Sequence, residues 1–224
     1  MISLHNHTIH SDGELIPSEL ARRCEIEGYS HIGITDHADS SNLETLVLST
    51  VKVCRDINKY FSSIKAIPGV ELTHVAPKQI AFLAKEARKL GAKLVLVHGE
   101  TIAEPVRPGT NFEALNSDID ILAHPGLITR KEVELAKKRG IYLEITTKNG
   151  HSLTNGHVAK LALQVGAKMV IGTDGHRPGE FVTLAQGLKT MQGAGLSVAQ
   201  SLVLLKNTKK IAEEKLNEKR KRRV

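Results

Sequence analysis

The sequence predicts a single α/β domain, folded as a closed barrel of seven β-α units. Seven short runs rich in Val, Ile and Leu alternate with longer stretches of helical period, which is typical of parallel strands joined by helical crossovers. Nearly every run ends in a residue that can bind a metal ion. The chain has 224 residues, a usual length for one α/β barrel with one core.

The apolar runs and the helical stretches can be placed in order along the chain. The expected strands lie near residues 2–5, 31–35, 66–72, 93–98, 119–123, 141–145 and 168–172. The expected helices lie near residues 17–28, 42–63, 77–91, 129–139, 154–165 and 197–216. Two of these helices begin at a proline and end before a glycine, at Pro17 to Gly28 and Pro77 to Gly91, which is the usual punctuation of a helix.

An open sheet with helices on both faces could be built from the same units, and the composition of the strands does not exclude it. The two folds place functional groups differently. An open sheet gathers them where the strand order reverses, whereas a barrel brings the C-terminal ends of all strands to one mouth. Six of the seven expected strands end in a potential metal ligand, and the remaining one ends in Glu144. This distribution favours the barrel.

Histidines and carboxylates follow the strands in a repeated pattern. The residues are His5, His7, Asp12, Asp36, His37, Glu71, His98, His124, Asp174 and His176. Residues two apart in a strand point to the same side, so His5 and His7 can hold one ion. A single histidine is more often a surface or core residue, but coincidence explains five strand ends poorly. Imidazole and carboxylate suit zinc, manganese and iron, so we expect a site for several metal ions.

The composition indicates a globular protein. Hydrophobic residues make up 41% and charged residues 25%. The formal charge is +7, but the run 219–223 carries five positive charges and leaves +2 for the rest. We expect one domain over residues 1–216 and a basic tail over 217–224. The tail is interpreted as a solvated helix end, and binding to an anionic partner is the alternative.

Composition also bears on partners and compartment. Aromatic residues make up only 3%, which leaves few of the stacking surfaces that bind single-stranded nucleic acids. Cys24 and Cys54 are expected to be reduced thiols, because two cysteines do not form a disulfide framework. No signal peptide or membrane-spanning apolar run is recognised, so a cytoplasmic location without a membrane partner is expected.

Four motifs between His5 and Arg177 resemble those of the PHP-domain family, the polymerase and histidinol phosphatase family of metal-dependent phosphoesterases. The motifs are L-H-N-H-T-x-x-S-D-G, I-T-D-H, L-A-H-P-G and G-T-D-G-H, in that order. The resemblance implies a distorted TIM-like (β/α)7 barrel, in agreement with the seven units found above. It also implies an enzyme that hydrolyses phosphoric esters.

The resemblance further implies two or three divalent ions, of zinc, manganese or iron, in one mouth. The ligands of the first ion would be His5, His7, Glu71 and Asp174. Glu71 would bridge to a second ion held by His98 and His124, and a third ion would be held by Asp12, His37 and His176. Such ions make a hydroxide available near neutral pH for attack on phosphorus. The catalytic group implied is His5, His7, Glu71, Asp174 and His176.

Arg177 stands where histidinol-phosphatase-like members carry an arginine, and a guanidinium there could bind phosphate with two hydrogen bonds. Arg107 is a second candidate for substrate binding, although its surroundings also fit a surface turn. Lys148 and His151 follow the sixth strand and could contact either substrate or solvent.

Asp36 is expected to orient a metal-bound histidine, and Glu144 to lie beside the ligands. His10, His74 and His157 are expected to be structural.

Three functions remain open at this point. The favoured one is hydrolysis of a small phosphomonoester of the histidinol phosphate type. The alternative is a phosphodiesterase or nuclease that acts on nucleotides or oligonucleotide ends. The third is a binding or regulatory module that uses the basic tail, against which the complete ligand set counts. The sequence indicates no oligomeric state.

Overall fold

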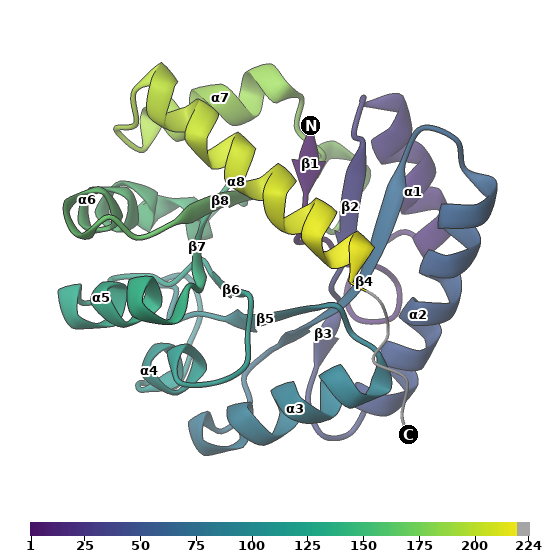
Figure 1. Cartoon of the computed structure of the whole chain (residues 1–224), viewed down its shortest axis with the longest axis horizontal. Coiled ribbons are helices and arrows are strands. Elements are labelled where there is room, and N and C mark those ends of the chain that lie inside the picture. Colours follow the sequence, from purple (N-terminus) through teal and green to yellow (C-terminus); the bar gives the residue numbers. More distant parts are fainter. Residues whose placement is uncertain (219–224) are drawn as a thin grey trace.

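The computed structural model describes residues 1–218 and confirms the predicted barrel (Figure 1). The strands are β1 (Ile2–Ser3), β2 (His31–Ile34), β3 (His37–Ala38), β4 (Lys65–Leu72), β5 (Leu94–His98), β6 (Ile121–Ala123), β7 (Tyr142–Thr146) and β8 (Met169–Gly172). All pairs are parallel, in the order β1-β2-β4-β5-β6-β7-β8, and β3 pairs with β4. A parallel bridge between Asn6 and Gly175 joins the two ends of the sheet.

Helices surround the strands on the outside of this sheet (Figure 1). The α-helices are α1 (Pro17–Ile26), α2 (Leu43–Tyr60), α3 (Ile80–Leu90), α4 (Thr110–Leu115), α5 (Arg130–Arg139), α6 (Asn155–Val165), α7 (Leu184–Gly193) and α8 (Val198–Asn217). Short 3₁₀ helices are η1 (Pro77–Gln79), η2 (His151–Thr154) and η3 (Pro178–Glu180). The sequence predicted six of the eight α-helices, and α4 and α7 are additions.

Strand residues alternate between two buried layers, as the period of two requires. In β5, Leu94 and Leu96 belong to a cluster inside the barrel, whereas Val95 and Val97 pack in the cluster between strands and helices. Helix α8 closes one end of the barrel, because Ile211 and Ala212 belong to the interior cluster. The C-terminal ends of the strands lie at the opposite end.

The helix α8 contacts the N-terminal ends of several strands. Asn207 donates to the carbonyl oxygen of Met169 at 3.0 Å, and Lys215 pairs with Asp120 at 2.7 Å. None of the helices among residues 1–218 is long and apolar enough to cross a membrane. Cys24 and Cys54 are buried free thiols. The basic run 219–223 lies outside the described residues, and the division at residue 216 and the cytoplasmic location stay predictions.

We expect Leu96→Ala to lower the free energy of unfolding by about 2–5 kcal/mol, because the side chain is fully buried inside the barrel and its loss leaves a cavity. The matched control is Leu202→Ala in α8, whose side chain is 55% exposed and should change stability by less than about 0.5 kcal/mol. Urea unfolding followed by circular dichroism measures both. Equal losses in the two variants would contradict the interior position of Leu96.

Candidate metal centre

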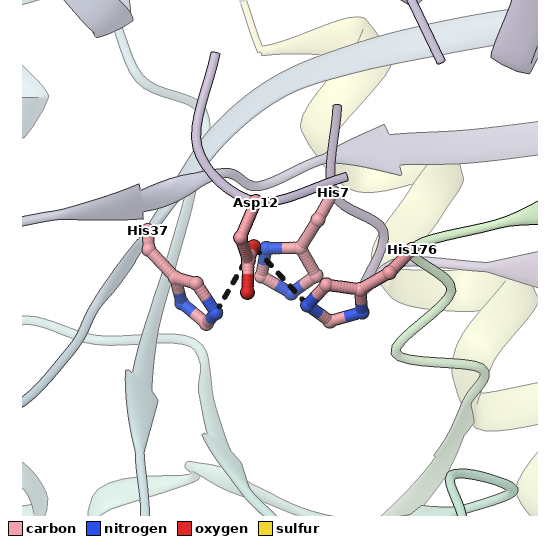
Figure 2. A group of neighbouring side chains, drawn as sticks. All are labelled: His7, Asp12, His37 and His176. Atoms are coloured by element: carbon pink, nitrogen blue, oxygen red, sulfur yellow. Dashed lines mark ion pairs between the residues drawn. The ribbon is translucent and has the colours of Figure 1, made fainter. Parts of the chain in front are cut away.

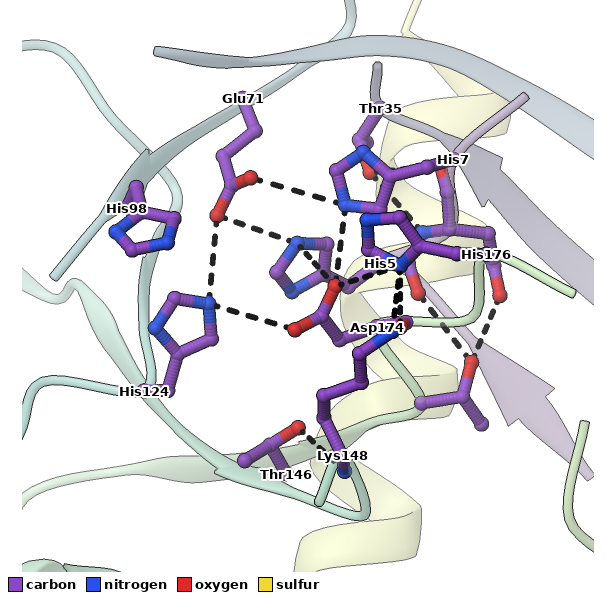
Figure 3. Close-up of polar contacts among 12 residues, drawn as sticks. His5, His7, Thr35, Glu71, His98, His124, Thr146, Lys148, Asp174 and His176 are labelled. Carbon is purple, nitrogen blue, oxygen red and sulfur yellow. Dashed lines mark hydrogen bonds and ion pairs between the residues drawn. The ribbon is translucent and has the colours of Figure 1, made fainter. Parts of the chain in front are cut away.

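The C-terminal ends of the strands bring all nine predicted ligands into one mouth (Figures 2 and 3). His5, His7 and Asp12 lie on the segment after β1, and His37 begins β3. Glu71 and His98 lie at the ends of β4 and β5. The remaining ligands follow β6 and β8, and they are His124, Asp174 and His176.

His5, His7, Glu71 and Asp174 lie within reach of one ion. His5 Nε2 is 3.2 Å from Glu71 Oε1, and His7 Nε2 is 3.2 Å from Asp174 Oδ1. His5 Nε2 also lies 3.7 Å from Asp174 Oδ1. Donor atoms that share a tetrahedral ion through bonds of about 2.1 Å stand about 3.4 Å apart, so this spacing fits a divalent ion.

Glu71 also faces the histidines of the second predicted site. His124 Nε2 is 3.6 Å from Glu71 Oε1 and 3.6 Å from Asp174 Oδ2. The rings of His98 and His124 meet edge to face, with centroids 4.4 Å apart. One oxygen of Glu71 thus lies between His5 and His124, which is the position that a bridging carboxylate needs (Figure 3).

Asp12, His37 and His176 form a third group (Figure 2). Asp12 Oδ1 is 3.5 Å from His37 Nε2 and 3.2 Å from His176 Nε2. The His7 ring lies between them, with its centroid 4.1 Å from His37 and 4.2 Å from His176. His7 therefore borders both the first and the third group, and the assignment of each ligand to one ion stays a prediction.

Unpaired buried atoms test whether these residues fit metal ions. Seven buried side-chain nitrogen or oxygen atoms lack a hydrogen-bond partner within residues 1–218, and six of them belong to this cluster. They are His5 Nε2, both ring nitrogens of His7, Glu71 Oε1, His98 Nδ1 and His124 Nδ1. Leaving one such group unpaired costs about 1–3 kcal/mol. Cations at the centre of the cluster would satisfy His5 Nε2, His7 Nε2 and Glu71 Oε1, which face one another.

The pKa shifts of the cluster suit cation binding for the carboxylates and for His7 and His124. Burial raises the pKa of Asp174, but the nearby His5 and His7 imidazoles outweigh it and hold this pKa below its usual range. Glu71 behaves in the same way beside His5 and His37. Burial lowers the pKa of His7 to about 4 and lowers that of His124 well below its ordinary value. Ionised carboxylates and unprotonated imidazoles are the forms that bind metals. For His5, His37 and His98, burial is outweighed by nearby carboxylates, which raise the pKa, so these rings would have to release a proton when an ion binds.

Glu144 positions two of the predicted ligands. Its Oε1 lies 2.9 Å from His5 Nδ1, which leaves His5 Nε2 free to face the cluster. Its Oε2 accepts from the backbone N–H of His124 at 3.2 Å, where the backbone has φ of 25°. Gly172 makes room for this carboxylate, because a Cβ there would stand 1.9 Å from Glu144 Oε1. The place predicted for Glu144 beside the ligands agrees with these contacts.

Within residues 1–218, Asp36 does not contact a histidine ring, contrary to the prediction that it orients a metal-bound histidine. It accepts hydrogen bonds from the Thr8 backbone at 2.6 Å, the Thr8 hydroxyl at 2.8 Å and the Ser11 hydroxyl at 2.8 Å. It therefore fixes the segment between His7 and Asp12 instead of orienting a histidine ring. Next to it, His37 Nδ1 contacts Thr73 Oγ1 at 2.6 Å and Glu71 Oε2 at 2.8 Å.

A pocket of about 330 Å³ opens over the cluster. Its lining residues are Asp12, Glu14, His37, His98, Glu104, Lys148, His151, Asp174, His176 and Arg177. Arg177 is exposed there, and its Nε donates to Glu180 Oε1 at 3.1 Å. Arg107 is exposed and is not among the lining residues.

Sequence reasoning left Glu14, Glu104 and Glu180 unremarked. Glu104 lies on a loop without a motif, and no local pattern shows that it would contact histidines. Lys148 and His151 were placed at the mouth from their position after a strand, and both line the pocket. Of the histidines expected to be structural, His10 is exposed, His157 Nε2 lies 2.7 Å from the carbonyl oxygen of Ile128, and His74 lies 3.2 Å from Glu104.

The model of the PHP domain family matches residues 3–148. The chain belongs to the PHP-domain family. This membership confirms the predicted family, the fold and the broad class of phosphoester hydrolase.

Three relatives and two solved structures show the range of this family and fold. An uncharacterized protein of Methanocaldococcus jannaschii is 47% identical over 86% of this chain and 89% of its own. DNA polymerase/3'-5' exonuclease PolX of Bacillus subtilis is 26% identical over 77% of this chain, but only 34% of its own length. A protein of Thermoanaerobacter sp. described as a probable phosphatase is 24% identical over 99% of this chain and 96% of its own.

Among solved structures, a chain from archaeal ribonuclease P with mature tRNA has a TM-score of 0.75 at 16% identity. The match covers 100% of this chain and 97% of the ribonuclease P chain. Histidinol phosphate phosphatase of Lactococcus lactis, complexed with zinc, L-histidinol and phosphate, has a TM-score of 0.59 at 14% identity. The match covers 88% of this chain and 94% of the phosphatase chain. At these identities the two structures show a shared fold alone.

We expect Glu144→Gln to weaken zinc binding by about 10–100-fold, because a neutral amide supports the His5 imidazole less well than a carboxylate does. Competition with a chromophoric chelator measures the affinity. The matched control is Glu134→Gln in α5, whose side chain is 52% exposed. An affinity in Glu144→Gln equal to that of the control would refute the positioning role.

Proposed function

We propose that this protein is a phosphomonoesterase that hydrolyses a small phosphorylated compound of the histidinol phosphate type with two or three divalent ions. The observation that carries the proposal is the gathering of nine predicted metal ligands in one mouth, five of which line a pocket of about 330 Å³: Asp12, His37, His98, Asp174 and His176. A pocket of this volume suits a small molecule. Zinc, manganese and iron all suit the imidazole and carboxylate ligands.

Each of the three ions would be bound by its own group of side chains. His5, His7, Glu71 and Asp174 would hold the first ion, His98 and His124 the second, and Asp12, His37 and His176 the third. Divalent ions at such a site supply a hydroxide near neutral pH and neutralise phosphate oxygens.

Two cationic side chains face the pocket and are available for the phosphate oxygens. Lys148 Nζ lies 2.9 Å from His176 Nδ1 and donates to Glu180 Oε2 at 2.8 Å. Glu180 also accepts from Arg177, so one carboxylate holds both cations at the rim. A dianionic monoester offers more charge to these groups than a diester does, which supports the proposed preference.

The comparisons support a small substrate and also keep the alternative open. A relative described as a probable phosphatase covers 99% of this chain, and a structural neighbour was solved with L-histidinol and phosphate. PolX and the ribonuclease P chain favour the alternative of a nuclease. The pocket volume and the aromatic content of 3% favour the small molecule over a nucleic acid.

The substrate class is tested by assaying the manganese-loaded protein with four substrates. They are histidinol phosphate, p-nitrophenyl phosphate, a bis-nitrophenyl diester and a short oligonucleotide. We expect kcat/KM to be highest for histidinol phosphate, and higher for the simple monoester than for the diester. Preferential hydrolysis of the diester or the oligonucleotide would overturn this proposal in favour of the alternative.

Arg177→Ala should raise KM for monoesters about tenfold or more with a smaller change in kcat, because a hydrogen bond to a charged group contributes about 1.5–3 kcal/mol. The matched control is Arg107→Ala, which removes an exposed arginine that does not line the pocket. Steady-state kinetics with p-nitrophenyl phosphate measure both. An unchanged KM in Arg177→Ala would exclude its role in phosphate binding.

A further inference from the structure

His151 adds an imidazole to the mouth outside the nine predicted ligands. It begins η2 after strand β7, and only 6% of it is exposed. Its ring stacks on His124, with centroids 4.2 Å apart and an interplanar angle of 14°, and meets His98 edge to face at 5.7 Å. One ring nitrogen each of His98, His124 and His151 lies within 4.8 Å of the other two.

A hydrogen bond fixes which nitrogen of His151 faces the pocket. Its Nδ1 lies 2.8 Å from the hydroxyl oxygen of Thr101, a residue only 4% exposed. Its Nε2 then points to the cluster, 3.8 Å from Asp174 Oδ2. Metal-binding histidines commonly use one nitrogen for the ion and the other for an oxygen that orients the ring, and Thr101 supplies such an oxygen.

Glu104 brings a carboxylate to the same place. Its Oε2 is 3.2 Å from His98 Nε2, and its Oε1 is 3.4 Å from His151 Nε2. Each spacing is close to the distance of about 3.4 Å expected between two donors on one ion. Glu104 reaches the two histidines with different oxygens, and a ligand atom of Glu104 also lies within 4.8 Å of ligand atoms of His74 and His98.

The two loops that carry these side chains hold each other in place. Thr101 and Glu104 lie after β5, and His151 lies after β7, so the Thr101 to His151 hydrogen bond ties one loop to the other. The loops also pack closely beside Gly150, where a Cβ would stand 3.4 Å from Ala103 Cβ. The hydrogen bond with Thr101 therefore orients the His151 ring without a bound ion.

We propose that His151 and Glu104 are two further ligands of the ion held by His98 and His124. The inference rests on the metal centre of the proposed function and extends it by two side chains. With the shared carboxylate of Glu71, the set would be three imidazoles and two carboxylates, and both ligand types suit zinc or another borderline ion. The affinity for this second ion would then be higher than His98, His124 and the shared Glu71 carboxylate alone would give.

Cobalt titration tests this assignment without any substrate. Metal-free protein is titrated with Co²⁺, and the visible absorption bands and the number of bound ions are measured in the presence of a competing chelator. We expect His151→Ala and Glu104→Gln each to weaken one class of Co²⁺ sites by at least about tenfold and to change its absorption spectrum. Thr101→Val should weaken the same class less, because it removes only the oxygen that orients His151.

His10→Ala is the matched control, because His10 is an exposed histidine on the segment after β1 and should leave every Co²⁺ site unchanged. Glu104 is 38% exposed, so Glu104→Gln keeps the test decisive if His151→Ala does not fold. Unchanged Co²⁺ affinity and spectra in both Glu104→Gln and a folded His151→Ala would overturn the assignment. A raised KM with unchanged Co²⁺ binding would also overturn it and assign His151 to the substrate.

The result of the cobalt titration can be distinguished from the result of the substrate assay. If Co²⁺ binding changes as expected while no monoester is hydrolysed, the extra ligands stand and the proposed function fails. If monoesters are hydrolysed while Co²⁺ binding is unchanged in these variants, the proposed function stands and the extra ligands fail.

Discussion

The contacts between the fully buried carboxylate of Glu71 and four surrounding histidines are the interactions on which the mouth of the barrel depends. Its Oε1 faces His5 and His124, and its Oε2 faces His37 and His7. Burial disfavours an ionised carboxylate, but the surrounding imidazoles outweigh burial and hold the pKa of Glu71 well below its usual range. Divalent cations between Glu71 and these rings would also satisfy Glu71 Oε1, which lacks a hydrogen-bond partner among residues 1–218. We therefore expect bound divalent ions to stabilise this mouth.

The barrel supports that arrangement through backbone geometry. The short strand β3 pairs with β4 in a register that sets His37 beside Glu71, so the two side chains are held by sheet hydrogen bonds. At the closing edge, Asp174 donates its backbone N–H to the His5 carbonyl at 2.9 Å. Asp174 and His124 have positive φ values of 49° and 25°, which a non-glycine residue rarely adopts. Such strain is typical of functional sites.

Much of this could be predicted because each ligand follows an apolar strand and the chemistry of the ligand types repeats. Those two signals predicted the seven main strands and the nine residues that the structure brings together in one mouth, whose role as metal ligands stays a prediction. Helix α4 was missed because six residues are too few to show a helical period. Helix α7 was missed because Gly187 lies within it, although its capping box of Thr183 and Gln186 was a usable signal. The contacts of Asp36 and Glu104 depend on loop paths, which sequence periodicity does not describe.

Anomalous diffraction from crystals grown with excess manganese or zinc tests the central claim most directly. The account predicts two or three anomalous peaks in the mouth, each within about 2.0–2.3 Å of its ligands, with Glu71 shared between two of them. A mouth without anomalous peaks, with His5, Glu71, His124 and Asp174 turned away from one another, would contradict it.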